Sequence, residues 1–218
     1  MSCLIPFFIS KSITVSLIKT KKSLGLSFSD YYHRMETLLS EGKTSGTNHS
    51  EAMIQYTQLN MQRMNRLLKT IEIEADLVEF VKSSQRSLGF LILAEAWCGD
   101  VAQNLPIIHK IIELNPNWQM HIVWRDENLD LMNEYLTNGA ISIPKVIIFD
   151  AFTFEELSVW GPRPAILQEK VMEYKADQKG IAYADFVESV HLWYAKDKGI
   201  ALQGEWKEML MKLSAQMA

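Results

Sequence analysis

Apolar and polar positions follow two different periods along this chain, and the change of period locates its elements. Between residues 50 and 71 the apolar positions recur every three to five residues, which predicts a long helix with one apolar stripe. Short continuous apolar runs at 88–94 and 145–149 are typical of buried strands. Further helices are expected over 31–39, 76–83, 99–114, 128–137, 183–196 and 205–213, and further strands over 121–124 and 157–160.

The order of these elements predicts the fold class. Strands alternate with helices from residue 88 onwards, which favours right-handed crossovers and an α/β domain whose mixed sheet carries helices on both faces. We expect four segments: a mobile extension over 1–29, a helical extension packed on the core over 30–84, the core over 85–175, and C-terminal helices over 176–218. The methionine-rich stripe of the 50–71 helix is assigned to core packing, with an adaptable binding groove as the alternative.

The first 29 residues carry four lysines and no acidic residue. A secretory signal places its positive charge before the apolar run, whereas here the apolar residues Leu4 to Ile9 precede Lys11, so export is not expected. Two interpretations remain for this segment. It is either a mobile extension or the result of a start assigned too early, with Met35 as the internal start.

Composition excludes several function classes. The chain is 48% hydrophobic and 22% charged with a net charge of −4, and it has no basic block that would follow a nucleic acid backbone. No apolar window approaches the length of a membrane span. The two cysteines, Cys3 and Cys98, form neither a disulfide framework nor a thiolate zinc cluster, so we expect no metal, no cofactor and a reducing, cytoplasmic location.

Cys98 is the candidate nucleophile. It lies between a predicted buried strand and the first turn of a predicted helix, in the run Ala96-Trp97-Cys98-Gly99-Asp100-Val101. The free N–H groups and the positive dipole end of a helix N-terminus favour a thiolate over a thiol. From position alone, an inert apolar cysteine is an equally open interpretation.

The same run resembles the thioredoxin superfamily, and the resemblance extends from Leu88 to about Tyr174. Trp97-Cys98-Gly99 matches the start of the family's Trp-Cys-Gly-Pro-Cys signature, and Pro106 falls at its helix-kinking proline. The segment from Asn138 to Pro144 is similar to the loop that carries the family's cis-proline.

This resemblance implies a thioredoxin fold with extra helices at both ends. The segments 95–100, 125–130 and 160–164 are further similar to a bacterial group of thioredoxin-family proteins that carry such helical extensions. Gly161 corresponds to the glycine that closes the family's substrate groove. The implied catalytic residue is Cys98, and the implied substrate-binding residues are Trp97, Gly99, Asp100, Ile143, Pro144, Gly161 and Arg163.

Three positions depart from the family pattern. Val101 stands where thioredoxin has its resolving cysteine, so a dithiol cycle cannot run at this site. Asp100 replaces the family's proline, and a carboxylate two residues from Cys98 opposes thiolate formation. Ile92 replaces the buried aspartate that serves the second cysteine. Glu95 is a possible local substitute, with a solvated or capping carboxylate as the more ordinary interpretation.

The remaining chemistry is that of a monothiol. Cys98 would attack a protein disulfide in thiol–disulfide exchange or be oxidised itself as a redox sensor, and an outside thiol such as glutathione would release the mixed disulfide. The backbone of Ile143 would pair with an extended peptide, and Arg163 would reach an anion such as a glutathione carboxylate unless it is a solvated loop residue. The alternative is a redox-inactive binding module that uses the cis-proline groove for protein–protein interaction. We expect Cys3 to take no part in resolving Cys98.

Overall fold

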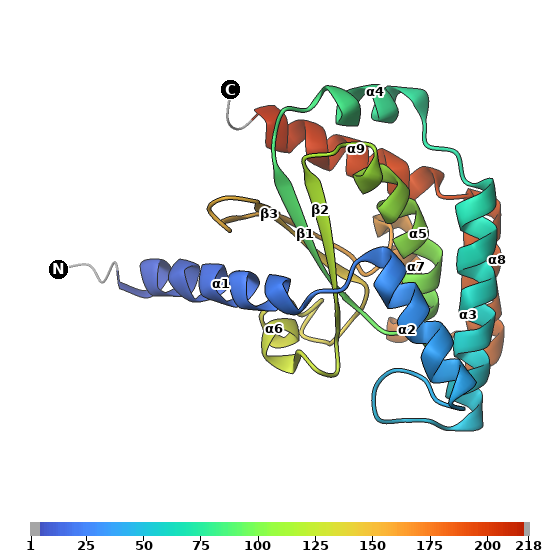
Figure 1. The fold of residues 1–218 in the computed structure, drawn as a ribbon. Coiled ribbons are helices and arrows are strands. Elements are labelled where there is room, and N and C mark those ends of the chain that lie inside the picture. Colours follow the sequence, from blue (N-terminus) through green and yellow to red (C-terminus); the bar gives the residue numbers. More distant parts are fainter. Residues whose placement is uncertain (1–4, 216–218) are drawn as a thin grey trace.

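A four-stranded mixed sheet surrounded by helices forms the protein, as seen in the computed structural model, which describes residues 5–215 (Figure 1). The strands are β1 (Leu88–Ala94), β2 (Trp118–Trp124), β3 (Lys145–Asp150) and β4 (Glu156–Trp160). The helices are α1 (Ile5–Leu24), α2 (Phe28–Ser40), α3 (Glu51–Thr70), α4 (Ala75–Ser83), α5 (Gly99–Glu113), α6 (Leu129–Glu134), α7 (Ala165–Ala176), α8 (Tyr183–Asp197) and α9 (Ile200–Ala215).

The sheet has the strand order β2-β1-β3-β4, with β1 and β2 parallel and the other pairs antiparallel. Ile92 of β1 is paired with Ile122 on one side and Val146 on the other. Every residue of β1 is buried, because this strand has a neighbour on each side and helices over the sheet. The predicted α/β fold with a mixed central sheet and extra helices is therefore confirmed.

Helix α5 begins directly after β1 and packs against β2, and α3 runs along α5 (Figure 1). Met64 and Leu67 of α3 are buried between these elements, in agreement with the core assignment of its apolar stripe. Asn60, one turn before Met64, donates a hydrogen bond to the carbonyl of Ala96 at 3.0 Å. Helix α3 therefore supports the turn that carries Cys98.

The structure departs from the mobile extension that was expected over residues 1–29. Residues 5–24 form α1, whose Ile18 is fully buried and which contacts β2. After this helix, Leu26 exchanges two backbone hydrogen bonds with Ile122, each of 2.8 Å. Apolar contact with the β2 edge fixes this part of the chain, while Cys3 lies outside the described residues. None of the described helices, α1 included, is long and apolar enough to cross a membrane.

Helices α6, α7 and α9 also differ from the sequence-based prediction. Helix α6 ends at Glu134, several residues early, because Tyr135 turns out of the helix and its hydroxyl donates to Glu156 Oε2 at 2.6 Å. Helix α7 was not predicted. Helix α9 starts at Ile200 instead of residue 205. Its Trp206 fills the core, with ring centroids 5.9 Å from Phe90 and 6.1 Å from Trp160.

Candidate functional site around Cys98

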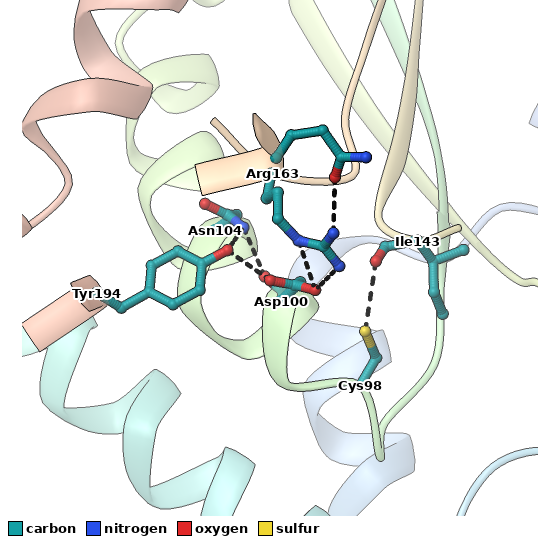
Figure 2. A network of polar contacts seen from close by, with 7 residues as sticks. Cys98, Asp100, Asn104, Ile143, Arg163 and Tyr194 are labelled. Atoms are coloured by element: carbon teal, nitrogen blue, oxygen red, sulfur yellow. Dashed lines mark hydrogen bonds and ion pairs between the residues drawn. The ribbon is translucent and has the colours of Figure 1, made fainter. Parts of the chain in front are cut away.

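Cys98 occupies the N-cap position of α5. Its backbone is extended, and its carbonyl accepts the first hydrogen bond of the helix from the N–H of Ala102 at 3.1 Å. The Cys98 thiol donates to the carbonyl of Ile143 at 3.4 Å, and the Ile143–Pro144 peptide bond is cis (Figure 2). The cysteine turn and the Ile143–Pro144 loop, which are 45 residues apart in sequence, therefore meet at one edge of the sheet.

The surroundings of Cys98 disfavour the thiolate. Burial of the sulfur, followed by the charge of Asp100, raises the pKa of Cys98 to about 12. The backbone N–H groups of Val101 and Asp100, with Arg163, act in the opposite direction but do not offset this. The raised pKa favours the protonated thiol at neutral pH, which is the form that can donate a hydrogen bond to the Ile143 carbonyl.

Asp100 is held by a network of polar side chains (Figure 2). Arg163 binds its Oδ2, and the Tyr194 hydroxyl donates to its Oδ1 at 2.6 Å. Asn104 donates to the Asp100 carbonyl at 2.8 Å and to the Tyr194 hydroxyl at 3.0 Å. Gln168 accepts from the other side of the Arg163 guanidinium at 2.7 Å. Arg163, which was expected to reach a ligand anion or to be solvated, is instead paired with Asp100.

The positions of the family's second cysteine and buried acid are filled with apolar side chains. Val101 and Ile92 are both buried in the core. Within the described residues Cys98 is the only cysteine, and no group of histidine, cysteine and carboxylate side chains there is placed to hold a metal ion. The site as described offers one thiol and no internal partner for it.

Glu95 is fully buried, which differs from the solvated or capping role that is ordinary for such a residue. Its Oε1 accepts a hydrogen bond from the N–H of Asp126 at 2.9 Å. Burial raises the pKa of Glu95, and the nearby charge of Asp126 acts in the same direction against the hydrogen bonds from Ser45 and Asp126. This carboxyl group fixes the loop beside the Cys98 turn.

The remaining family positions surround Cys98 on two sides. Trp97 is half-buried, and the Arg125 guanidinium lies 4.9 Å from the centre of its indole ring. Gly161 has a φ of +114°, and a Cβ built on it would lie 2.2 Å from the carbonyl oxygen of Pro144. Only glycine fits that close approach. Ile143 is 5% exposed, so the edge that was expected to dock an extended peptide is largely covered.

A pocket of about 620 Å³ opens on the other side of Cys98, between α3, α7 and α8. Gly99 lies at its base, where a Cβ would come within 3.2 Å of His191 Cε1 and 3.9 Å of Arg63 Nη1. Its lining comprises Met53, Tyr56, Arg63, Trp97, Cys98, Gly99, Asp100, Arg163, Val171, Tyr174, Lys175, Tyr183, Phe186, Val187, Val190, His191 and Tyr194.

Sequence reasoning missed most of this pocket. Ile143, Pro144 and Gly161 do not line it, whereas Trp97, Cys98, Gly99, Asp100 and Arg163 do. The one available signal was the methionine-rich stripe of α3, whose N-terminal part, including Met53, faces the pocket. The residues from α7 and α8 carried no recognisable pattern.

Comparisons with known proteins agree with this fold. A family model described as Thioredoxin matches residues 46–178, which is more than half of the chain. A crystal structure of a protein of unknown function from Pseudomonas aeruginosa is similar with a TM-score of 0.55 and 18% identity, covering 86% of this chain and 98% of that one. An HIV epitope-scaffold is similar with a TM-score of 0.52 and 17% identity, over 81% of this chain and 97% of that one.

At these identities the two structures show a shared fold and nothing further. The comparison with curated proteins gives no match. The family match covers the cysteine turn, the Ile143–Pro144 loop and all four strands in their observed order. This chain belongs to the thioredoxin family.

Proposed function

We propose that this protein is a thioredoxin-fold binding protein in which Cys98 is kept as a neutral thiol. The environment of Cys98 carries the proposal: the sulfur is buried, lies beside Asp100 and donates to the Ile143 carbonyl. Burial and the Asp100 charge both raise the pKa of Cys98, so the thiolate is disfavoured at pH 7. A thiol in that state is a poor nucleophile.

The binding site in this proposal is the pocket beside Cys98. A pocket of about 620 Å³ has the size of a small-molecule site, and its walls are largely apolar and aromatic. The cis-proline edge is the less suitable surface, because Ile143 is covered and its carbonyl is already engaged by the thiol. We therefore place the ligand against α3, α7 and α8.

Monothiol exchange is the second candidate, favoured by the fact that Cys98 itself lines the pocket. In that reaction the Cys98 sulfur, having lost its proton to solvent, attacks a disulfide R–S–S–R. The S–S bond breaks, a mixed disulfide forms on Cys98, and the leaving thiolate takes up a proton. A low-molecular-weight thiol such as glutathione then attacks the R sulfur of the mixed disulfide, so that a disulfide between R–S and glutathione leaves and Cys98 regains its proton.

The rate of alkylation by iodoacetamide against pH separates the two candidates. It is measured on a Cys3→Ser variant so that only Cys98 reacts, with the Cys3→Ser, Cys98→Ser double variant as the blank. We expect the rate to keep rising up to at least about pH 10, because only the thiolate reacts. A plateau reached below about pH 8 would overturn the neutral-thiol proposal in favour of monothiol exchange.

Binding in the pocket is tested with the neutral apolar dye Nile red. We expect dye fluorescence to rise with the wild type and to be lost in Val190→Trp, which fills the pocket from α8. Leu192→Trp is the matched control, because Leu192 is 53% exposed on the same helix and does not line the pocket. Equal dye binding by the two variants, or none by the wild type, would contradict a ligand site here.

A further inference from the structure

The charges that line the pocket beside Cys98 are unbalanced. Asp100 is the one acidic residue of the lining, and Arg163 and Tyr194 already occupy its oxygens. Arg63 and Lys175 then add two positive charges with no lining carboxylate left to pair with them. The pocket lining therefore carries a net positive charge that no lining carboxylate balances.

Arg63 of α3 is the cation nearest the base of this pocket. Its Nη1 donates to Asn60 Oδ1 at 2.9 Å, and within residues 5–215 no carboxylate forms an ion pair with it. Asn60 is in turn fixed by its bond to the Ala96 carbonyl, so the guanidinium is held in place. A guanidinium carries five N–H donors in a planar fork that suits a carboxylate, and the bond to Asn60 uses one of them.

His191 of α8 lies beside Arg63 over Gly99. Its Nδ1 is buried and has no hydrogen-bond partner in the described part of the chain. Burial, and then the charge of Arg63, lowers the pKa of His191, while Asp100 acts in the opposite direction. A neutral imidazole beside an unpaired guanidinium provides a second polar contact for an anion without adding to the charge repulsion.

Helices α7 and α8 give the pocket a mainly apolar lining. The ring centroids of Tyr174 from α7 and Phe186 from α8 lie 3.8 Å apart, and the ring planes differ by 3°, so the two side chains form a stacked aromatic surface. Val171, Val187 and Val190 extend this surface on the same two helices. Such a lining gains free energy by covering hydrocarbon, and Lys175 of α7 is the one lysine or arginine that it contains.

We propose that this pocket binds an organic monocarboxylate with an apolar body, its carboxylate at Arg63 and His191 and its hydrocarbon part against α7 and α8. This inference rests on the proposed function in that it takes the same pocket as the ligand site. Because the cationic base and the apolar lining are separate parts of the pocket, the ligand that fits has one charged end and one apolar end. A pocket of about 620 Å³ holds a chain of medium length.

The test is titration calorimetry of the full chain with dodecanoate and, at equal concentration, with neutral dodecanol. We expect dodecanoate to bind more tightly than dodecanol by at least about tenfold, because only the carboxylate forms a charge-assisted hydrogen bond with Arg63. Arg63→Gln is expected to weaken dodecanoate binding to a similar degree and to leave dodecanol unchanged. Arg66→Gln is the matched control, because Arg66 is exposed on the same helix and does not line the pocket.

Two results would overturn the inference. One is dodecanoate affinity no greater than that of dodecanol, and the other is equal dodecanoate binding by Arg63→Gln and Arg66→Gln. Nile red binding by the same samples then shows that the pocket is folded and open, so loss of anion preference is separated from loss of the site. The iodoacetamide test of Cys98 uses no carboxylate ligand, so its outcome is separate from the outcome of this titration.

Discussion

Arg163 binds Asp100 through two of its nitrogens, with Nε at 3.1 Å and Nη2 at 2.5 Å from the same carboxylate oxygen. Both side chains are 15% exposed, so this is a partly buried ion pair in the lining of the pocket beside Cys98. Arg163 therefore neutralises part of the Asp100 charge directly. Its own effect on Cys98 also lowers the pKa of the thiol, but it is the smallest of the effects on that pKa and does not offset burial and Asp100.

Removal of the Asp100 charge is predicted to make Cys98 more acidic. Asp100 is the second cause of the raised pKa of Cys98 after burial, and Asp100→Asn also frees Arg163 to act on the thiol. We expect the iodoacetamide rate at pH 8 to rise by about tenfold, which corresponds to about one pKa unit. Asp185→Asn, an exposed position in the first turn of α8, should leave the rate unchanged. An unchanged rate in Asp100→Asn would show that burial alone sets the acidity.

Introduction of a second thiol at Val101 is predicted to restore little reductase activity. Val101 is 1% exposed, and Ile92 offers no carboxylate to accept the proton of a new buried thiol. In reductase-coupled insulin reduction, wild type and Val101→Cys should both stay close to the Cys98→Ser blank, because a second thiol speeds only the release step. Turnover by Val101→Cys well above that blank would mean that Cys98 already attacks disulfides, and monothiol exchange would replace the binding proposal.

The central sheet was predictable from the sequence because β1 and β3 are buried on both faces. Such strands are continuous apolar runs, and their order with the following helices limits the topology. Helix α1 was not predictable in the same way. Residues 1–29 were expected to form a mobile extension, and only the position of Ile18 against the sheet shows which face of α1 is buried.

The candidate site likewise has one part that local motifs predicted and one part that they did not. The Cys98 turn and the loop to Pro144 were placed by local motifs, and the structure brings them together. Arg63 and His191 belong to helices that are more than a hundred residues apart in sequence, and they meet only through the packing of α8 beside α3. The pairing of Arg163 with Asp100 could not be predicted for the same reason, because nothing in the sequence around either residue indicates which residue it will contact.

The buried Glu95 carboxyl group is predicted to lower the free energy of unfolding as the pH rises. Burial raises its pKa in the folded state above the unfolded value of 4.5. Between these two pKa values the folded protein therefore binds more protons than the unfolded protein. The contribution of Glu95 to stability is therefore present below about pH 4.5 and is lost as the pH rises through the folded pKa. Glu95→Gln, which retains an acceptor for the Asp126 N–H, should gain stability relative to the wild type between pH 4.5 and pH 8.

Urea unfolding at the two pH values measures this difference. Glu169→Gln on the exposed face of α7 is the control, and its stability should follow that of the wild type. If the difference between Glu95→Gln and the wild type does not change with pH, the Glu95 carboxyl group is not shifted by its burial.

Gly161 is predicted to be the least replaceable glycine of the site. Alanine at this position would need a φ of +114° and would put its Cβ 2.2 Å from the Pro144 carbonyl oxygen, which is backbone and cannot turn aside. We expect Gly161→Ala to lower the free energy of unfolding by about 3 kcal/mol or more. Because Gly161 holds the Pro144 loop against the sheet, the Cys98 thiol should also become more accessible to alkylation.

Gly204 in α9 provides the matched comparison for Gly161. A Cβ at Gly204 meets no atom within 4 Å, and its φ is that of an ordinary helix, so Gly204→Ala removes only the entropic cost of a helical glycine. We expect this variant to gain about 1 kcal/mol of stability. Urea unfolding of the two variants therefore gives changes of opposite sign if the close approach of Gly161 to Pro144 is real. Two small changes of the same sign would mean that the loop yields, and that the Ile143 carbonyl is not held rigidly against the Cys98 thiol.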